Sequence, residues 1–150
     1  MGYLLLAAAV FALDAIIKKH MDQTIEPGQK RELFGGRVIL HKYYNRGAAL
    51  DLLSRSPRLV RYVAGGVLAF VCALALPLLR QKGQRGLKLG LSLVIGGGAN
   101  NLYDRIKRGY VVDYFSFKSR FPRLQRIVFN LSDWCIFVGS VLVAVCGRKK

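Results

Sequence analysis

The sequence predicts an all-α membrane protein, a four-helix transmembrane bundle with a small β-sheet in its first long loop. Two observations lead to this fold class. Hydrophobic residues make up 53% of the 150-residue chain, and the charged residues leave four long apolar gaps. A bilayer core about 30 Å thick is crossed by about 20 apolar residues in a helix. A chain of this length supports one domain. We therefore expect residues 1–150 to form a single integral membrane domain.

Each apolar gap predicts one membrane span. The spans are expected at about residues 2–18, 60–80, 87–105 and 127–147. Residues 62–79 contain no charge and hence no polar stripe, which argues against the alternative of a soluble helical bundle. The first and third spans are short, and we expect flanking side chains such as Lys18 and Lys19 to snorkel to the interface. The first span should be retained, because it lacks a basic start and carries Asp14 late in its apolar run.

The loop after the first span is predicted to be β-rich over about residues 25–57, since it is too long for a simple connector. The Gly35-Gly36 pair marks a turn. Residues 37–44 (RVILHKYY) are rich in β-branched and aromatic side chains, which are typical of a strand. Residues 47–53 could continue the sheet or bend around an apolar object. We expect two to four strands here, on the face of the membrane.

The net charge is +16, from 24 basic and 8 acidic residues. Such a charge favours nucleic acid or an anionic membrane surface as partner. Nearly all basic residues lie outside the apolar gaps and no nucleic-acid motif is present, so we expect contact with membrane lipids and none with nucleic acid. Four spans would place seven basic residues on the side of the termini and seventeen on the other. By charge counting alone, the larger set would face the cytoplasm or the orientation would stay undecided.

The cysteines and histidines indicate neither a disulfide framework nor a metal site. Cys72, Cys135 and Cys146 all fall in apolar gaps without a C-x-x-C pattern, and His20 and His41 are isolated. We therefore expect no metal and no cofactor.

Four of the eight acidic residues should meet at one membrane face of an up-down bundle. They are Asp14, Asp104, Asp113 and Asp133. Ionisable groups within spans are expensive and are candidates for function. In a close pair, Asp113 could act with Asp133 as general base and general acid on a water molecule. The alternatives are a solvated loop residue at Asp113 and a helix-capping residue at Asp133, or a proton or cation site of a small transporter at Asp14 or Asp133.

Other polar residues near this face could support such a pair. Asp14 and Lys18 share a helix face at i, i+4 spacing and can form an ion pair. Arg105, next to Asp104, could neutralise a carboxylate or anchor the interface. Three amides near membrane depth can hold a peptide backbone or orient a carboxylate, namely Asn45, Asn101 and Asn130. A basic scaffold without enzymatic activity is a further hypothesis, supported by charge alone.

Five motifs follow one another along the chain: Asp14-x-x-x-Lys18, residues 45–49 (NRGAA), 96–105 (GGGANNLYDR), 109–114 (GYVVDY) and 129–133 (FNLSD). In this order they resemble the motifs of signal peptidase II, the bacterial lipoprotein signal peptidase. Each motif is modest alone, but together they span most of the chain. The resemblance implies an aspartic intramembrane peptidase that crosses the bacterial cytoplasmic (inner) membrane several times, with the predicted β-sheet on the extracytoplasmic side. Its substrate would be a diacylglyceryl-modified prolipoprotein, cut just before the lipidated cysteine near the extracytoplasmic face. Globomycin-type inhibitors would bind it.

The resemblance also implies a role for each matched residue. Asp113 and Asp133 would be the catalytic dyad, and Asp14 and Lys18 would give structural support. Substrate binding or support of the dyad would fall to Asn45, Gly47, Asn101, Asp104, Arg105 and Asn130.

The chain departs from the family pattern at four positions around these motifs. Asn100 stands where the family usually has Gly, Gly98 and Ser132 stand where it has Ala, and Tyr114 replaces the usual Phe. Ser132 adjoins Asp133 and could form a local hydrogen bond. These departures leave room for a divergent paralogue with altered substrate preference.

Overall fold

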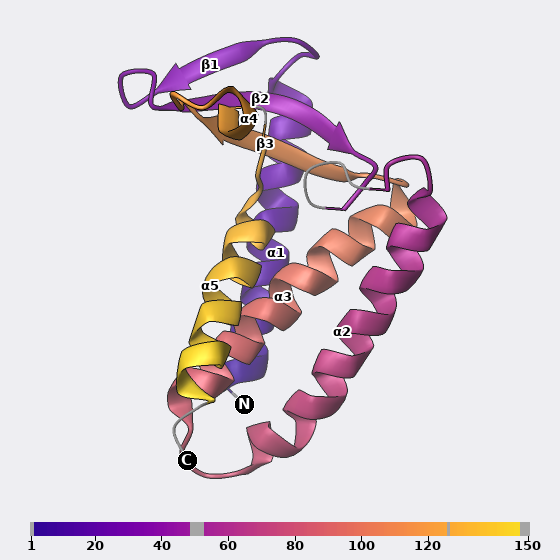
Figure 1. Ribbon diagram of the computed structural model, residues 1–150, viewed down its shortest axis with the longest axis vertical. Helices are drawn as coiled ribbons and strands as arrows, with labels where there is room; N and C mark the ends of the chain where they lie inside the picture. Colours follow the sequence, from indigo (N-terminus) through magenta and orange to yellow (C-terminus); the bar gives the residue numbers. More distant parts are fainter. Residues whose placement is uncertain (1, 49–52, 126, 148–150) are drawn as a thin grey trace.

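Four long helices carry a small sheet across one end, while the start of α1 and the end of α5 lie at the other (Figure 1). The computed structural model describes residues 2–48, 53–125 and 127–147. The long helices are α1 (Gly2–Thr24), α2 (Pro57–Arg80), α3 (Arg85–Lys107) and α5 (Leu131–Cys146). A short helix, α4, covers Pro122–Gln125. A helix thus occupies each of the four predicted ranges.

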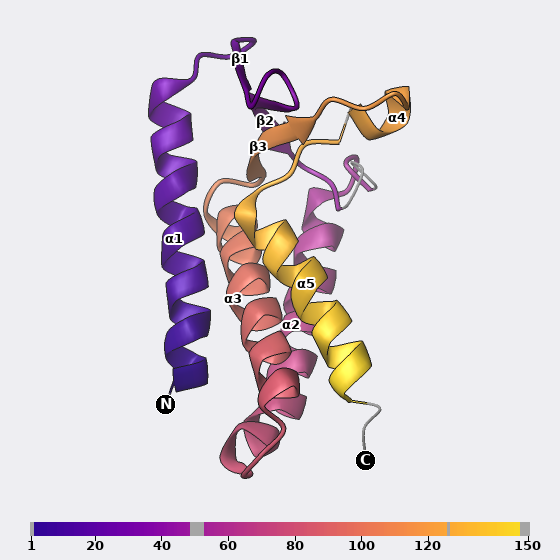
Figure 2. The ribbon, with the colours of Figure 1, turned by 90° about the vertical axis from the view of Figure 1, so that its left-hand side faces the viewer.

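Helix α3 lies between the other three long helices and packs against each of them (Figures 1 and 2). Glycine allows this close approach. A Cβ atom at Gly96 would lie 2.5 Å from the backbone oxygen of Ala7 on α1, and one at Gly97 would lie 2.6 Å from that of Ser132 on α5. Helix backbones in contact through small residues are typical of membrane bundles. The polar residues of α3 are thereby held close to α1 and α5.

The sheet is antiparallel, in the order β1-β2-β3, with strands Lys30–Leu33, Val38–Asn45 and Val111–Phe117. The prediction of a sheet of two to four strands is confirmed, but its placement in the first loop alone was wrong. Strand β3 comes from the segment between α3 and α5. It is buried on both faces over most of its length, so its sequence lacks the polar alternation that marks a half-exposed strand. Of the predicted continuation over 47–53, residues 49–52 lie outside the described residues.

The pairing of β2 with β3 shifts by one residue near the middle of the sheet. Leu40 lies opposite Phe115, but Tyr43 lies opposite Asp113, so two residues of β2 face Tyr114 alone. Such an irregularity is a β-bulge, which bends the strand and re-aims its side chains.

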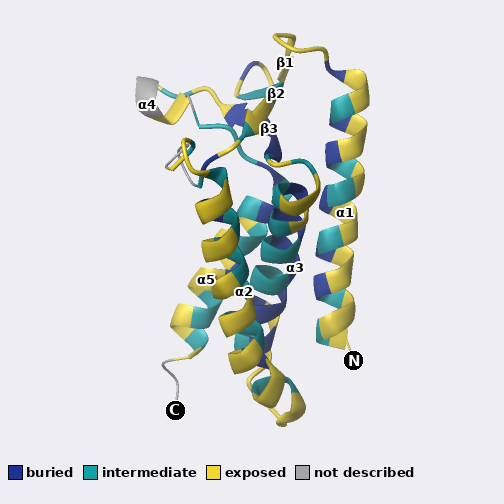
Figure 3. Cartoon of the chain, turned by 90° about the vertical axis from the view of Figure 1, so that its right-hand side faces the viewer, coloured by how far each residue is buried: buried dark blue, intermediate teal, exposed yellow. Residues whose placement is uncertain are grey.

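The molecule buries polar side chains and exposes apolar ones along its helices. Asp14, Asn130 and Ser132 are each 0% exposed, whereas Phe70 on α2 is 64% exposed. Figure 3 shows buried residues where α1 faces α3 and exposed residues along the outward surface of α2. Helix α2 is long and apolar enough to cross a membrane, and α5 is a shorter apolar helix. This distribution is expected where lipid surrounds the helices.

Helix α1 extends beyond the predicted range of 2–18 to Thr24. Lys18 does not snorkel as expected, because its side chain is only 1% exposed and points into the bundle. The lysine therefore belongs to the polar interior, and the helix continues past it toward the sheet.

Candidate active site

Two carboxylates from neighbouring elements line one pocket of about 460 Å³ at the end of the bundle that carries the sheet. Asp113 comes from β3, and Asp133 comes from the first turn of α5. Asn45, Asn101 and Arg105 line the same pocket. The structure therefore brings together residues that are up to 88 positions apart in the sequence, as the motifs predicted.

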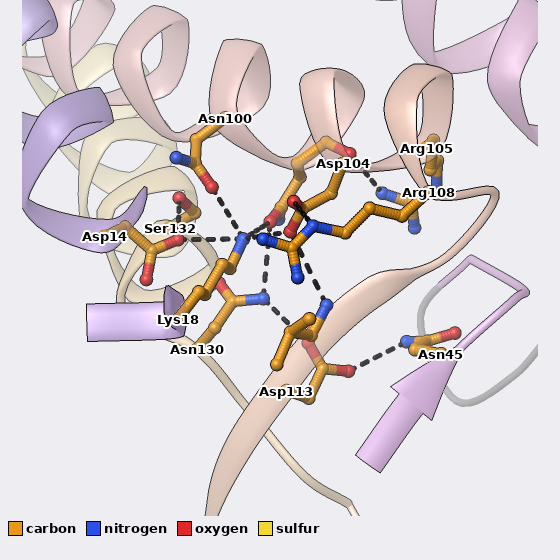
Figure 4. A network of polar contacts seen from close by, with 12 residues as sticks. Asp14, Lys18, Asn45, Asn100, Asp104, Arg105, Arg108, Asp113, Asn130 and Ser132 are labelled. Carbon is orange, nitrogen blue, oxygen red and sulfur yellow. Dashed lines mark hydrogen bonds and ion pairs between the residues drawn. The ribbon is translucent and has the colours of Figure 1, made fainter. Parts of the chain in front are cut away.

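Both oxygens of Asp113 accept hydrogen bonds from amide groups (Figure 4). Asn45 Nδ2 donates to Oδ2 at 3.0 Å, and Asn130 Nδ2 donates to Oδ1 at 2.7 Å. The other end of each amide is also held: Asn45 Oδ1 accepts from the backbone N–H of Gly47 at 3.0 Å, and Asn130 Oδ1 accepts from that of Asp133 at 2.9 Å. Because a backbone N–H can only donate, both amides must turn their NH₂ groups toward Asp113.

Asp133 combines a capping role with a place in the pocket. Its Oδ2 accepts from the backbone N–H of Asn130 at 3.1 Å, which completes a capping box at the start of α5. Its Oδ1 accepts from Asn101 Nδ2 at 2.8 Å. The helix cap that the sequence offered as an alternative is present, and the same carboxylate also faces the pocket.

Burial, together with the nearby Asp133 carboxylate, raises the pKa of Asp113 to about 7, although the amides of Asn45 and Asn130 and the ammonium of Lys18 act in the opposite direction. The Asp113 side chain is almost fully removed from water, so its charged form is disfavoured. A carboxyl group with a pKa near neutrality can exchange a proton at physiological pH. The pair is thus suited to general acid/base chemistry.

A buried lysine stands behind the pocket, where α1 meets α3. Lys18 Nζ lies 2.9 Å from Asp14 Oδ2 and 3.1 Å from Asp104 Oδ2, which confirms the predicted Asp14–Lys18 ion pair. It also donates to Oδ1 of Asn100 at 2.6 Å and to Oδ1 of Asn101 at 2.9 Å. Four acceptors around one ammonium compensate the loss of water on burial.

Comparison with known proteins decides the family. The family model described as "Signal peptidase (SPase) II" matches residues 6–147 of the chain. The chain belongs to the signal peptidase II family. Membership makes it a peptidase, and the predicted resemblance is confirmed.

Relatives of this family align over nearly the whole chain. A "Lipoprotein signal peptidase" of Nostoc punctiforme is 37% identical over 149 residues, covering 96% of this chain and 87% of that protein. One of Mesorhizobium japonicum is 37% identical over 143 residues, covering 94% and 82%. A solved structure described as a bacterial membrane enzyme, determined by the in meso method, shares the fold with a TM-score of 0.81 at 21% identity. That match covers 99% of this chain and 88% of the solved chain.

Asp104 and Arg105 are adjacent in one motif, but their side chains have different surroundings. Asp104 turns toward Lys18 and toward Arg108, whose Nε lies 3.4 Å away. Arg105 does line the pocket, but within the described residues it forms no ion pair with a carboxylate. It donates instead to the backbone oxygens of Gly47 at 2.8 Å and Asn101 at 3.2 Å.

The sequence reasoning missed several polar residues around the site. Arg108 was not singled out, although its i, i+4 spacing from Asp104 was a usable signal. Tyr114 and Ser132 were noted as departures from the signal peptidase II pattern, with a local hydrogen bond expected for Ser132. Both hydroxyls instead bind the distant Asp14. No local signal could have shown this, because the partners are 100 and 118 positions apart.

Proposed function

We propose that this chain is an aspartic endopeptidase that removes the signal peptide from diacylglyceryl-modified prolipoproteins, cutting just before the lipidated cysteine. Family membership and the lipoprotein signal peptidase relatives support the substrate class. The observation that carries the catalytic type is the pair Asp113 and Asp133 in one pocket, each held by amide donors.

The contacts of the pair suit hydrolysis by water. One carboxylate takes a proton from water while the other, protonated, donates to the oxygen of the scissile carbonyl. Collapse of the tetrahedral intermediate then returns a proton to the leaving amine. The amides of Asn45, Asn101 and Asn130 hold the carboxylates in place during these transfers, and such preorganisation lowers the barrier.

The surroundings of the pocket fit an apolar, lipid-bearing substrate. Val128, Ile136 and Phe137 line the pocket itself. A second cavity of about 310 Å³, largely apolar, lies between α2 and α3 and also reaches Asn101 and Arg105. We infer that these connected apolar surfaces receive the signal peptide and the acyl chains, with Arg105 and Gly47 at the polar end. A globomycin-type inhibitor would occupy the same pocket.

We infer further that α1, α2, α3 and α5 span the bacterial cytoplasmic membrane, with the sheet and the pocket at the extracytoplasmic face. The apolar outer surfaces of the helices support the spanning arrangement. Because the seventeen basic residues would then lie outside, orientation needs its own test. A single accessible cysteine placed at exposed Phe34, in a chain whose other cysteines are replaced, should react with an impermeant thiol reagent in whole spheroplasts. Labelling only after lysis would overturn this orientation.

The decisive experiment is a gel-shift cleavage assay on a lipidated prolipoprotein. Asp113→Asn and Asp133→Asn should each abolish cleavage while the chain still folds. Asp22→Asn is the matched control, because Asp22 pairs with Lys42 and Arg108 away from the pocket. Globomycin should inhibit the parent protein, and EDTA should leave it active. Full activity in either dyad variant, or loss with EDTA that zinc restores, would overturn the proposal.

A further inference from the structure

The carboxylate of Asp14 is held by two hydroxyl groups that the proposed hydrolysis does not use. Tyr114 donates to Oδ1 at 2.9 Å, and Ser132 donates to Oδ2 at 2.5 Å. Lys18 lies 2.9 Å from the same Oδ2. All four side chains are buried, with Asp14 and Ser132 at 0% exposure, and Figure 4 shows Asp14, Lys18 and Ser132 meeting at one point. Each hydroxyl therefore joins α1 to an element that carries a pocket carboxylate.

The hydroxyl of Tyr114 has a second partner that ties β3 to α5. It accepts a hydrogen bond of 2.9 Å from the backbone N–H of Leu131, the first residue of α5. That N–H has no acceptor within its own helix. Tyr114 directly follows Asp113, and Leu131 lies two residues before Asp133. One hydroxyl group thus connects a residue next to Asp113 with a residue two positions from Asp133.

Ser132 reinforces the same connection from the α5 side. It lies next to Asp133 in the first turn of α5, and its hydrogen bond ends on the carboxylate that Tyr114 also binds. Helix α1 makes few other contacts with α5 and β3, since it packs mainly on α3. Asp14 is therefore a shared anchor for the strand and the helix from which the two pocket carboxylates project.

Backbone hydrogen bonds also hold β3 against the segment that leads into α5. The two hydroxyls should therefore adjust the geometry between β3 and α5 and not create it. The backbone N–H groups of Tyr114 and Phe115 both donate to the oxygen of Phe129, and the N–H of Phe129 donates to the oxygen of Phe115. These bonds fix the chain before α5, whereas the hydroxyl of Tyr114 fixes the first turn of α5 itself. A loss of the hydroxyls would let the two carboxylates drift while the fold persists.

We propose that Tyr114 and Ser132 are positioning residues that, through Asp14, set the separation of the Asp113 and Asp133 carboxylates. The inference rests on the proposed aspartic dyad. Its chemical basis is the pair of hydroxyl groups that bind Asp14, which Phe and Ala at these two positions would lack. Misplacement of reacting groups by less than an ångström is enough to slow a reaction.

The test compares Tyr114→Phe and Ser132→Ala with matched controls in the cleavage assay on a lipidated prolipoprotein. Tyr44→Phe is the control for the tyrosine, because the Tyr44 hydroxyl also binds a carboxylate, Asp22 at 2.8 Å, outside the pocket. Ser92→Ala is the control for the serine, because Ser92 is a buried helix residue whose hydroxyl donates to the backbone oxygen of Lys88 in its own helix. Thermal unfolding of every variant identifies effects on stability.

Each positioning variant should lower kcat about tenfold and leave KM within about twofold. The dependence of kcat on pH should be bell-shaped for two titrating carboxylates, and the bell should be narrower in each positioning variant. Carboxylates that move apart influence each other less, so their two apparent pKa values move closer together. The controls should keep both the turnover and the profile of the parent. The inference would be overturned if each positioning variant had the kcat and the pH profile of its own control. The pairs to compare are Tyr114→Phe with Tyr44→Phe, and Ser132→Ala with Ser92→Ala.

The dyad variants separate this inference from the proposed function. If Asp113→Asn and Asp133→Asn are inactive and the positioning variants behave as their controls, the dyad stands and the positioning role fails. If either dyad variant is active, the proposed function fails, and the positioning role fails with it.

Discussion

The ammonium group of Lys18 donates a hydrogen bond of 2.9 Å to Oδ1 of Asn101, which lies 83 positions away on another helix. An ammonium has no acceptor, so the amide of Asn101 must turn its oxygen toward Lys18 and its NH₂ toward Asp133. The observed distance from Asn101 Nδ2 to Asp133 Oδ1 is 2.8 Å. A lysine outside the pocket thereby determines which group of the amide faces a proposed catalytic carboxylate.

Replacing Lys18 with methionine should strongly destabilise the protein. The change leaves the buried carboxylates of Asp14 and Asp104 without their shared cation, and breaking a buried pair from one side costs about 3–5 kcal/mol. Lys42→Met is the control, because its partner Asp22 is partly exposed and keeps Arg108. That variant should lose about 0–1 kcal/mol. Denaturant unfolding in detergent measures both, and equal losses would contradict the role of Lys18.

The stability of the protein should fall between about pH 4 and pH 7 because of Asp113. Its pKa is raised from 3.8 to about 7 in the folded state, chiefly by burial. In this window the folded state holds a proton that the unfolded state has released, so folding weakens as the pH rises. Asp113→Asn removes this titration. Between pH 5 and pH 8, the unfolding temperature of the parent should drop more than that of the variant. If the two unfolding temperatures change with pH in parallel, the raised pKa of Asp113 is refuted.

Gly97→Ala should disrupt the packing of α3 against α5. The new Cβ would lie 2.6 Å from the backbone oxygen of Ser132, which cannot move without shifting the start of α5. Overpacking of this kind costs about 1–3 kcal/mol. Gly98→Ala is the neighbouring control, since its Cβ would meet only the side-chain end of Leu68 at 3.3 Å. Gly98→Ala should unfold close to the parent, and a Gly97→Ala variant that does the same would show that the helices can separate without loss.

Arg105→Lys should weaken substrate binding more than turnover. The planar guanidinium holds the backbone oxygens of Gly47 and Asn101 together at the rim of the pocket, and a lysine cannot reproduce this fork. We expect KM to rise about tenfold, which corresponds to about 1.4 kcal/mol, with kcat nearly unchanged. Arg31→Lys is the control, because Arg31 is exposed and binds the backbone oxygen of Thr24 away from the pocket. A fall in kcat at constant KM would assign Arg105 to the transition state instead.

The sequence predicted those parts of the molecule that depend on local pattern. The four apolar gaps located the long helices, because each gap is close to the length of a helix that could cross a membrane. The Asp14–Lys18 pair followed from i, i+4 spacing, which determines a shared helix face before any tertiary contact forms.

The rest depended on contacts that no local pattern encodes. Strand β3 was missed because a strand buried on both faces shows no alternation. The burial of Lys18 was missed because three of its four acceptors come from α3, some 80 residues later. The motifs indicated which residues would gather, but their individual contacts needed the structure. Asp104, for example, turns toward Lys18 and Arg108.

The one-residue shift between β2 and β3 determines which side chains of β2 lie on the same face of the sheet as Asp113. Side chains alternate between the two faces of a strand, so a slip by one residue exchanges the faces. Without the extra residue, Lys42 would stand opposite Asp113, and Asn45 would fall on the other face of the sheet. With it, Tyr43 takes that place, and Asn45 shares the face of Asp113 and donates to its carboxylate. The extra residue in β2 thus gives the Asp113 carboxylate the neutral amide of Asn45 as its partner. Without it, the cationic Lys42 would stand opposite Asp113.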